Sequence, residues 1–306
     1  MFRAELSYEP RVDFFADDMG RRFNFIHVSR PKTKKLVIHF TAFFGDWGER
    51  KEYRENYQGY FHRLKMLKDV TDYGFLFLCD QFGVEKNGTY YTGEKGDFFV
   101  ERAVINIIQQ ALLRDGISEE NVITIGSSSG ATAALKFGLI FGVRGIVAIC
   151  PHIDLDTSAA LQGRSAHVAF IVPDGDPLSS LNRAYTRQVS NAVADRDVTR
   201  HPLPRVFMQT CTDDHGVYSE QVVPFVDLWH KKGGLVDLDV RSFGGHTSEY
   251  ATKAVILDVL QKLFSGDKVD TRDYATRRRY RAESRRSFYS KLIDISKALG
   301  VHRKRP

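Results

Sequence analysis

Residues 122–131 constrain the fold of this chain more than any other stretch. A β-branched apolar run ends at Gly126, a turn of three serines follows, and after Gly130 the chain continues into an alanine-rich segment of helical character. This is the pattern G-x-S-x-G between a strand and a helix, which holds a serine hydroxyl on a tight turn, clear of neighbouring side chains. Only Ser128 has glycine two residues away on both sides, so it is the candidate nucleophile.

Two other interpretations of this stretch stay open at this point. Glycine- and serine-rich turns open helices in many α/β proteins, and some of them bind phosphate. The stretch lacks the Lys-Ser/Thr pair of a Walker loop, and the spacing G-x-G-x-x-G is absent. We therefore interpret it as a nucleophile elbow, provided that the chain downstream supplies the residues that activate a serine.

Alternating apolar and amphipathic segments predict the architecture. Short apolar runs predict buried strands, and they are separated by segments of helical periodicity such as residues 97–114. The predicted strands cover residues 36–40, 75–80, 122–125, 146–151, 205–211 and 235–243. Strands and helices in this order favour a mostly parallel, doubly wound sheet with right-handed crossovers. Residues 2–8 and 22–28 predict an antiparallel hairpin at the beginning of the chain.

The chain of 306 residues, 42% of them hydrophobic, can bury one large core with a small appendage. We expect a main domain at residues 1–268 and a basic helical tail at residues 269–306. Residues 152–203 depart from the alternating order and predict a cap insertion over the site, where substrate choice would be made. Within the cap, residues 167–172 form a short apolar run.

Composition excludes several classes of protein. There is no run of about 18 apolar residues and no apolar leader at the first residues, so we expect a cytoplasmic protein. Cys79, Cys150 and Cys211 each end an apolar run without a C-x-x-C or metal-ligand spacing, which predicts free buried thiols. Neither a metal nor a tightly bound cofactor is implied.

The partners that a nucleophilic serine needs follow in the order Ser, Asp, His. Each candidate lies just after a predicted strand, and such strand ends meet at one edge of a parallel sheet. His246, after two glycines, is the candidate general base. Asp213 and Asp214 are the candidate acids, and the distance from the strand end favours Asp213. A polar residue in the cap, at Asp174 or Asp176, competes only if the cap contributes a strand to the main sheet.

Backbone N–H groups are the candidates for stabilising a developing oxyanion. The N–H of Ser129 would face it from the start of the helix that follows the elbow. The second donor would be the N–H of Thr41 or Ala42, in the loop after the first buried strand. His39, at the end of that strand, is interpreted as a packed histidine rather than a catalytic one.

These motifs resemble those of the α/β-hydrolase superfamily over about residues 35–264. The resemblance rests on residues 126–130, the Asp213/Asp214 turn and His246, and it implies an α/β-hydrolase fold. Residues 80–83 and 88–91 also make the chain similar to hydrolase-like proteins of bacterial capsular polysaccharide biosynthesis and accessory secretion. That narrower resemblance implies activity on glycans or glycoproteins, in some members as O-acetyltransferases. The His-Gly oxyanion motif of the superfamily is missing, because Phe40 follows His39.

The basic character of the chain belongs to its last segment. The net charge is +6, yet residues 271–306 hold twelve Lys/Arg against three Asp/Glu, a net charge of +9, which leaves −3 on the first 270 residues. Apolar residues from Phe288 to Leu299 recur at roughly helical spacing. An amphipathic helix here could lie on an anionic membrane surface or hold a polyanionic polysaccharide, or it could dock on the protein with its arginines in water. No nucleic-acid recognition motif appears, and we expect no nucleic-acid partner.

These observations predict a serine-dependent acyl-transfer enzyme that acts on a glycan or a small ester substrate. It would be an esterase or an O-acetyltransferase on an acidic, capsule-like polysaccharide, with acetyl-CoA as the acyl donor if it is a transferase. We expect it in the cytoplasm, with a peripheral position at the inner membrane face if the tail binds lipid. The alternative is a non-catalytic accessory protein that uses the same fold to bind glycan or a partner enzyme.

Overall fold

A computed structural model describes residues 10–45, 51 and 58–271 of the chain. The described residues form an eight-stranded sheet with the order β1-β2-β4-β3-β5-β6-β7-β8. The strands are β1 Val12–Ala16, β2 Arg22–Val28, β3 Leu36–Phe40, β4 Gly74–Leu78, β5 Val122–Ser127, β6 Gly145–Ile149, β7 Arg205–Cys211 and β8 Val236–Arg241. From β4 to β8 every neighbouring pair is parallel, which confirms the predicted mostly parallel, doubly wound sheet.

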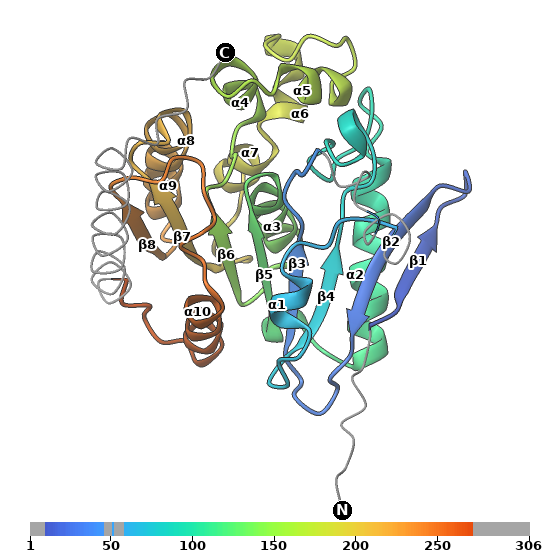
Figure 1. Ribbon diagram of the computed structural model, residues 1–306. Coiled ribbons are helices and arrows are strands. Elements are labelled where there is room, and N and C mark those ends of the chain that lie inside the picture. Colours follow the sequence, from blue (N-terminus) through green and yellow to red (C-terminus); the bar gives the residue numbers. More distant parts are fainter. Residues whose placement is uncertain (1–9, 46–50, 52–57, 272–306) are drawn as a thin grey trace, which may run out of the picture. The chain divides into compact units, whose positions relative to one another are not determined.

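Helices cover both faces of the sheet (Figure 1). The long helices α2, α3 and α9, with α7, pack on one face, and α1 and α10 pack on the other. The helices are α1 Leu64–Leu67, α2 Phe99–Asp115, α3 Ser129–Phe141, α4 Leu155–Leu161, α5 Ser165–Ile171, α6 Arg183–Thr186, α7 Gln188–Ala194, α8 His215–Val217, α9 Val223–Lys231 and α10 Lys253–Ser265. Between α8 and α9 the chain passes through one π-helical segment, Tyr218–Val222.

Burial differs between the central strands and the edge of the sheet. The central strands β3, β4, β5 and β6 are buried at every position, as strands covered on both faces must be. The edge strand β8 alternates between buried and half-buried positions. The side chain of Trp229, on α9, is fully buried and is among the largest side chains in the core. This double covering leaves the carboxyl edge of the parallel strands as the place for polar chemistry.

The N-terminal hairpin differs from the sequence prediction in one arm. β1 pairs antiparallel with β2 across a turn at residues 17–20, so the first arm is β1 and not residues 2–8. Residues 2–8 lie outside the described part of the chain. β2 then pairs antiparallel with β4, which joins the hairpin to the parallel part of the sheet.

The regular secondary structure in residues 152–203 is helical. Its apolar run at residues 167–172 falls largely in helix α5, so the segment contributes no strand to the sheet. Helices α4, α5 and α6 lie beyond the carboxyl edge of β5 and β6, whereas α7 packs against α3 as a crossover helix would (Figure 1). The part of the segment that stands over the sheet edge therefore ends before α7.

The chain divides into two compact units, with the first ending at Val269 and the second starting at Asp270. The predicted tail at residues 269–306 lies outside the described residues beyond its first three positions. None of the helices in the described part is long and apolar enough to cross a membrane.

Candidate active site

The turn between β5 and α3 holds Ser128 in a strained backbone conformation. Ser128 has φ 53° and ψ −122°, between the end of β5 at Ser127 and the first residue of α3 at Ser129. A positive φ is uncommon for a residue with a side chain and is tolerated where the surroundings enforce it. Here the Ser128 N–H donates a hydrogen bond of 2.8 Å to the Ile149 carbonyl oxygen at the end of β6. The serine is therefore fixed at the carboxyl edge of the sheet.

The two flanking glycines are required by close backbone contacts. A Cβ atom on Gly126 would overlap the carbonyl group of Gly130, and one on Gly130 would overlap the carbonyl oxygen of Phe40. The strand and the helix thus approach each other more closely than any side chain would allow. This explains both glycines of the motif by packing.

Ser128, His246 and Asp214 form a continuous hydrogen-bonded chain. The distance from Ser128 Oγ to His246 Nε2 is 2.7 Å, and the distance from His246 Nδ1 to Asp214 Oδ2 is also 2.7 Å. If Nδ1–H donates to the carboxylate, Nε2 is left free to accept the serine proton. Asp214 follows β7 and His246 lies in the loop after β8, and the Asp214 side chain is 9% exposed. The arrangement has the geometry needed to activate a serine as a nucleophile.

The preference for Asp213 over Asp214 is corrected by this geometry. Asp213 directs its carboxylate to the histidine loop, where Oδ2 accepts from the Gly244 N–H and Oδ1 from the Gly245 N–H, both at 2.9 Å. Desolvation opposes ionisation of Asp213, but the hydrogen bonds from Gly245 and Gly244 outweigh it and lower the pKa of this carboxyl group. Asp213 thus holds the backbone of the loop, whereas Asp214 contacts the imidazole of His246.

The two cap aspartates do not compete for this role. Asp174 is exposed, and its carboxylate accepts hydrogen bonds from the Asn182 side chain and the Asp176 backbone N–H. Asp176 is also exposed and accepts from the Leu178 N–H. Both carboxylates are used within their own loop.

Of the three proposed oxyanion donors, the structure leaves two available. The Ser129 N–H is the first of α3 and has no acceptor within the helix. The Ala42 N–H has no hydrogen-bond partner among the described residues. The expectation for Thr41 is wrong, because its N–H is already hydrogen-bonded to the Leu78 carbonyl oxygen at 3.1 Å and the Tyr91 hydroxyl at 2.7 Å. Ser129 and Ala42 remain as the candidate pair.

His39 is a packed histidine, as the sequence predicted. Its ring is fully buried in β3, and neither ring nitrogen has a hydrogen-bond partner in the part of the chain that the structure describes. Burial, with smaller effects of the nearby Arg63 and His62, keeps the pKa of His39 well below its usual value. A neutral imidazole is therefore part of the core here.

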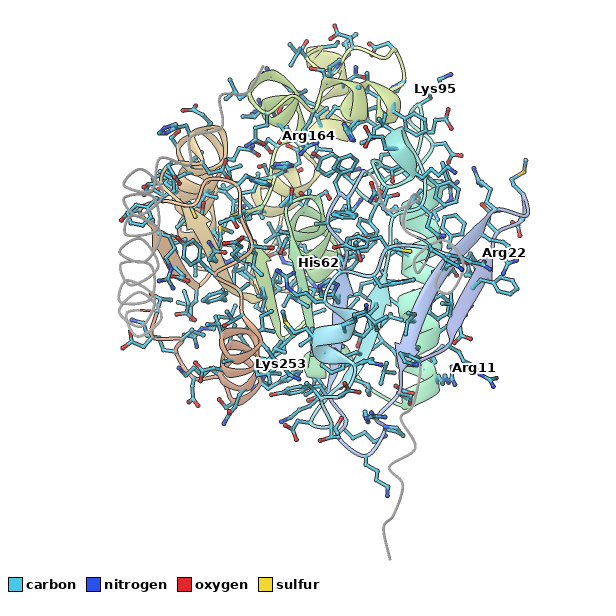
Figure 2. The ribbon with its side chains drawn as sticks, viewed as in Figure 1. Arg11, Arg22, His62, Lys95, Arg164 and Lys253 are labelled. Atoms are coloured by element: carbon cyan, nitrogen blue, oxygen red, sulfur yellow. The ribbon has the colours of Figure 1, made fainter. Side chains whose placement is uncertain are left out.

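Behind the elbow lies a buried arginine that the sequence analysis missed. Arg63 donates to Ser127 Oγ at 2.8 Å and to His62 Nδ1 at 3.3 Å, and it has a left-handed backbone with φ 62°. Burial lowers the pKa of the Arg63 guanidinium to about 10. Burial, together with the Arg63 charge, lowers the pKa of His62 to about 3. Figure 2 labels His62 near the middle of the molecule.

A second missed group gathers around the imidazole of His246. The ring of His152 lies against that of His246, with centroids 4.7 Å apart and planes 20° apart. The Tyr90 hydroxyl is 2.9 Å from His152 Nδ1. Arg164, which directly precedes α5 and is labelled in Figure 2, lies with its guanidinium carbon 5.0 Å from the centre of the Phe43 ring. The sequence did hold one signal for His152, which is its position. It comes three residues after the last residue of β6, at the same sheet edge as the other site residues.

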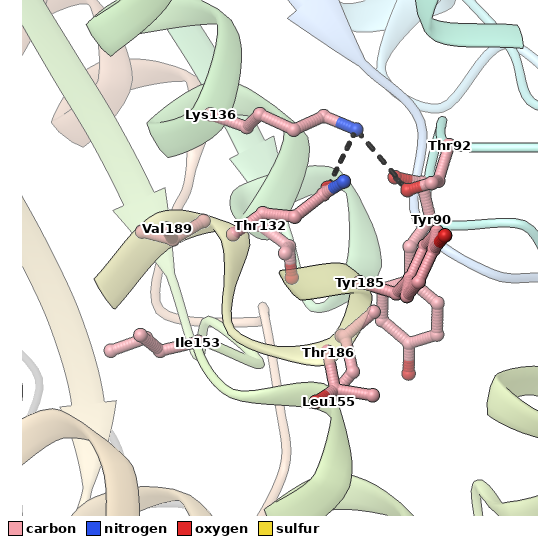
Figure 3. Close-up of a pocket in the computed structure, with 10 residues that line it drawn as sticks. Tyr90, Thr92, Thr132, Lys136, Ile153, Leu155, Tyr185, Thr186 and Val189 are labelled. Carbon is pink, nitrogen blue, oxygen red and sulfur yellow. Dashed lines mark hydrogen bonds between the residues drawn. The ribbon is translucent and has the colours of Figure 1, made fainter. Parts of the chain in front are cut away.

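A small cavity lies between α3 and the loop that carries Tyr90 (Figure 3). Lys136 is buried there and donates to the Tyr91 carbonyl oxygen at 2.9 Å and to Thr92 Oγ1 at 3.2 Å, with Glu101 as its ion-pair partner at 3.2 Å. Burial lowers the pKa of Lys136, although Glu101 opposes the shift. Lys136 is thus paired with groups of the loop and with Glu101, so we assign it to support of the loop. The described residues contain no cluster of His, Cys, Asp or Glu that could hold a metal ion.

Comparison with known proteins finds similar solved structures but no similar sequence. No protein-family model matches the chain, and no curated protein sequence matches it. Among solved structures, the capsule O-acetyltransferase of Neisseria meningitidis serogroup A is similar with a TM-score of 0.59 and 18% identity, over 80% of this chain and 96% of that one. A variant of that enzyme in complex with CoA gives a TM-score of 0.59 and 17% identity, over 82% and 95% of the two chains.

Two further structures show the breadth of the similarity. A fluorophosphonate-binding serine hydrolase of Staphylococcus aureus has a TM-score of 0.56 and 11% identity, over 83% of this chain and 97% of that one. The Glycosylation Associate Protein complex of Streptococcus agalactiae has a TM-score of 0.59 and 18% identity, over 83% of this chain but 45% of that one. These similarities establish the α/β-hydrolase fold for this chain.

Proposed function

We propose that this protein of α/β-hydrolase fold is a serine-dependent acyl-transfer enzyme. Ser128 is the nucleophile, His246 is the general base and then the general acid, and Asp214 orients the imidazole. The observation that carries the proposal is the unbroken contact from Asp214 through His246 to Ser128 at 2.7 Å on each side. The residues come from three separate loops at one sheet edge, an arrangement that core packing alone does not call for.

In the first half of the reaction, Ser128 Oγ attacks the carbonyl carbon of an acyl donor while His246 Nε2 takes the hydroxyl proton. The resulting oxyanion accepts hydrogen bonds from the backbone N–H groups of Ser129 and Ala42. The Phe43 N–H donates to Ser129 Oγ at 2.8 Å, which holds the loop carrying Ala42 against the start of α3. Collapse of the intermediate returns the proton from His246 to the leaving group and leaves an acyl ester on Ser128.

In the second half, His246 takes a proton from the acceptor hydroxyl, whose oxygen attacks the acyl carbon. The bond between Ser128 Oγ and the acyl carbon then breaks, and His246 returns the proton to Ser128 Oγ. The acceptor is water in a hydrolase and a sugar hydroxyl in a transferase. We infer that the acceptor is an acidic glycan. Arg164 lies beside the site, and no carboxylate among the described residues pairs with it, so it is available to an anionic group of the substrate. The similarity to a capsule O-acetyltransferase supports a glycan acceptor, and its CoA complex supports acetyl-CoA as the donor.

A fluorophosphonate probe tests the nucleophile. The wild-type protein is expected to be labelled, and Ser128→Ala is expected to lose the label completely because no other hydroxyl of the described residues is paired with His246. Ser127→Ala serves as the matched control, since Ser127 contacts Arg63 instead of the imidazole, and it should still be labelled. Labelling of Ser128→Ala, or loss of label in both variants with the fold intact, would contradict the assignment.

An assay of acetyl transfer tests the acceptor. Acetyl-CoA or an acetyl ester is supplied with and without a de-acetylated acidic polysaccharide, and acetylated glycan and free acetate are measured. Arg164→Ala is expected to lower the ratio of glycan acetylation to acetate release by about tenfold, equivalent to about 1.4 kcal/mol, whereas Arg164→Lys keeps most of it. An unchanged ratio in Arg164→Ala would exclude the anionic acceptor site.

The alternative is a non-catalytic accessory protein that binds glycan or a partner enzyme. The similarity to part of the Glycosylation Associate Protein complex is the observation that favours it. A wild-type protein that is never labelled by the probe, together with a Ser128→Ala variant that binds the polysaccharide with unchanged affinity, would support this role over catalysis.

A further inference from the structure

The backbone around His152 is fixed from several directions. Thr132, one turn into α3, donates its hydroxyl to the His152 carbonyl oxygen. The N–H groups on either side are also used: that of Cys150 donates to the Gln209 carbonyl oxygen at 2.7 Å, and that of Ile153 donates to the Gln221 side chain at 2.7 Å. The segment after β6 is thus tied to the helix that begins at the elbow. His152 is held in place before any substrate binds.

The ring of His152 is fixed as firmly as its backbone. Only 2% of the residue is exposed, and the Tyr90 hydroxyl is 2.9 Å from Nδ1. Tyr90 itself is 3% exposed, and burial raises the pKa of its hydroxyl, so that it stays protonated. The Tyr90 O–H donates to Nδ1 at the edge of the ring, and one flat face of the imidazole lies against the ring of His246.

His246 needs such a support because of where it lies. Its loop contains Gly244 and Gly245, both with positive φ, and its side chain is 32% exposed. The hydrogen bonds to Asp214 and Ser128 lie in the plane of the ring, one at each nitrogen. They leave the ring free to tilt about the line that joins the two nitrogens. A flat group against the ring face removes that freedom, and His152 is such a group.

His152 also stays neutral beside a base that becomes charged. Burial lowers the pKa of His152 well below its usual value, and the nearby His246, Arg164 and His167 lower it further. These groups come from the loop after β8 and from the cap, and Tyr90 faces the ring from the loop after β4; no carboxylate among the described residues contacts its nitrogens. A neutral ring neither takes the serine proton nor repels the imidazolium that forms on His246.

We propose that His152 is a positioning residue, which stacks on His246 and holds that imidazole in the plane joining Ser128 to Asp214. This inference rests on the proposed acyl-transfer function, because it concerns the base of the same site. It assigns no bond-making step to His152, whose effect is exerted through the orientation of His246. Misplacement of a reacting group by about 1 Å can cost about a hundredfold in rate, so loss of the stack should be measurable.

The test compares His152→Ala with His152→Phe, using kcat and KM for a small acetyl ester, the rate of fluorophosphonate labelling and thermal unfolding. His152→Ala removes the ring and is expected to lower kcat and the labelling rate by about thirtyfold with KM within about twofold. His152→Phe keeps a flat ring of similar size and should recover activity to within about fivefold of wild type. Because Phe cannot titrate, an unchanged acidic limb of the kcat/KM profile in His152→Phe would agree with a neutral His152.

Three results would overturn the inference. These are wild-type rates in a folded His152→Ala, rates in His152→Phe as low as in His152→Ala, or loss of an ionisation from the pH profile of His152→Phe. If His152→Ala does not fold, the comparison of His152→Phe with wild type still shows whether activity requires a flat ring at this position or a nitrogen that titrates. A wild-type protein that is not labelled at all would instead contradict the proposed function, so the two failures are distinguishable.

Discussion

At the scale of single residues, the two adjacent aspartates differ in what each one holds. Asp214→Ala removes the acceptor of the His246 Nδ1–H and is expected to lower kcat by about 10³- to 10⁴-fold, as loss of the orienting acid does in serine enzymes. Asp213→Ala frees the N–H groups of Gly244 and Gly245, which loosens the loop, and should lower kcat by only about tenfold while lowering the thermal midpoint. Esterase kinetics and calorimetry on both variants check this. Equal losses of kcat in two folded variants would contradict the assignment.

The same pair shows why the site was predictable only in outline. The elbow serine, the histidine and an aspartate pair could be found from their positions after apolar runs, because strand ends of a parallel sheet meet at one edge. The choice between Asp213 and Asp214 depends on side-chain direction in a turn, which spacing does not encode. Thr41 was misjudged for a related reason, since its N–H is bonded to Tyr91, a residue fifty positions away. Contacts of this kind are set by the tertiary fold.

At the scale of elements, the junction of β5 and α3 makes a prediction about stability. Gly130→Ala would place a methyl group against the carbonyl oxygen of Phe40 and is expected to reduce the free energy of unfolding by about 3 kcal/mol or more. Gly163→Ala is the matched control, because Gly163 has φ +65° and open space around it, so only left-handed strain of about 1 kcal/mol applies. Urea unfolding of both variants provides the comparison. A Gly130→Ala protein no less stable than Gly163→Ala would refute this account of the elbow.

The elements themselves were predicted unevenly. Continuous apolar runs identified the central strands, because a strand covered on both faces has no polar side. The apolar run at residues 167–172 was too short to distinguish a strand from a helix by pattern, and it forms most of α5. The hairpin arm was displaced because β1 lies at the sheet edge, where its residues are half-buried or exposed and do not alternate regularly between apolar and polar. Strong burial is readable from sequence, and edges and insertions are not.

At the scale of the whole molecule, buried histidines couple stability to pH. Burial holds the pKa values of His39 and His152 well below the usual value, and lowers the pKa of His62 to about 3. In the unfolded chain these histidines bind protons below about pH 6.5, whereas in the folded protein they stay neutral to much lower pH. The unfolded state therefore binds more protons in this window, and stability falls as the pH falls.

The expected loss is large enough to measure. Between about pH 7 and about pH 5.5, each of the three histidines should reduce the free energy of unfolding by about 1 kcal/mol, or about 3 kcal/mol together. His39→Phe tests the origin of this slope, because the His39 ring makes no hydrogen bond to any described residue and Phe preserves an aromatic ring in β3. It should remove about 1 kcal/mol of the pH dependence while leaving stability near pH 7 little changed. Urea unfolding at constant ionic strength measures both, and a wild-type protein equally stable at the two pH values would show that these rings are not held neutral by the fold.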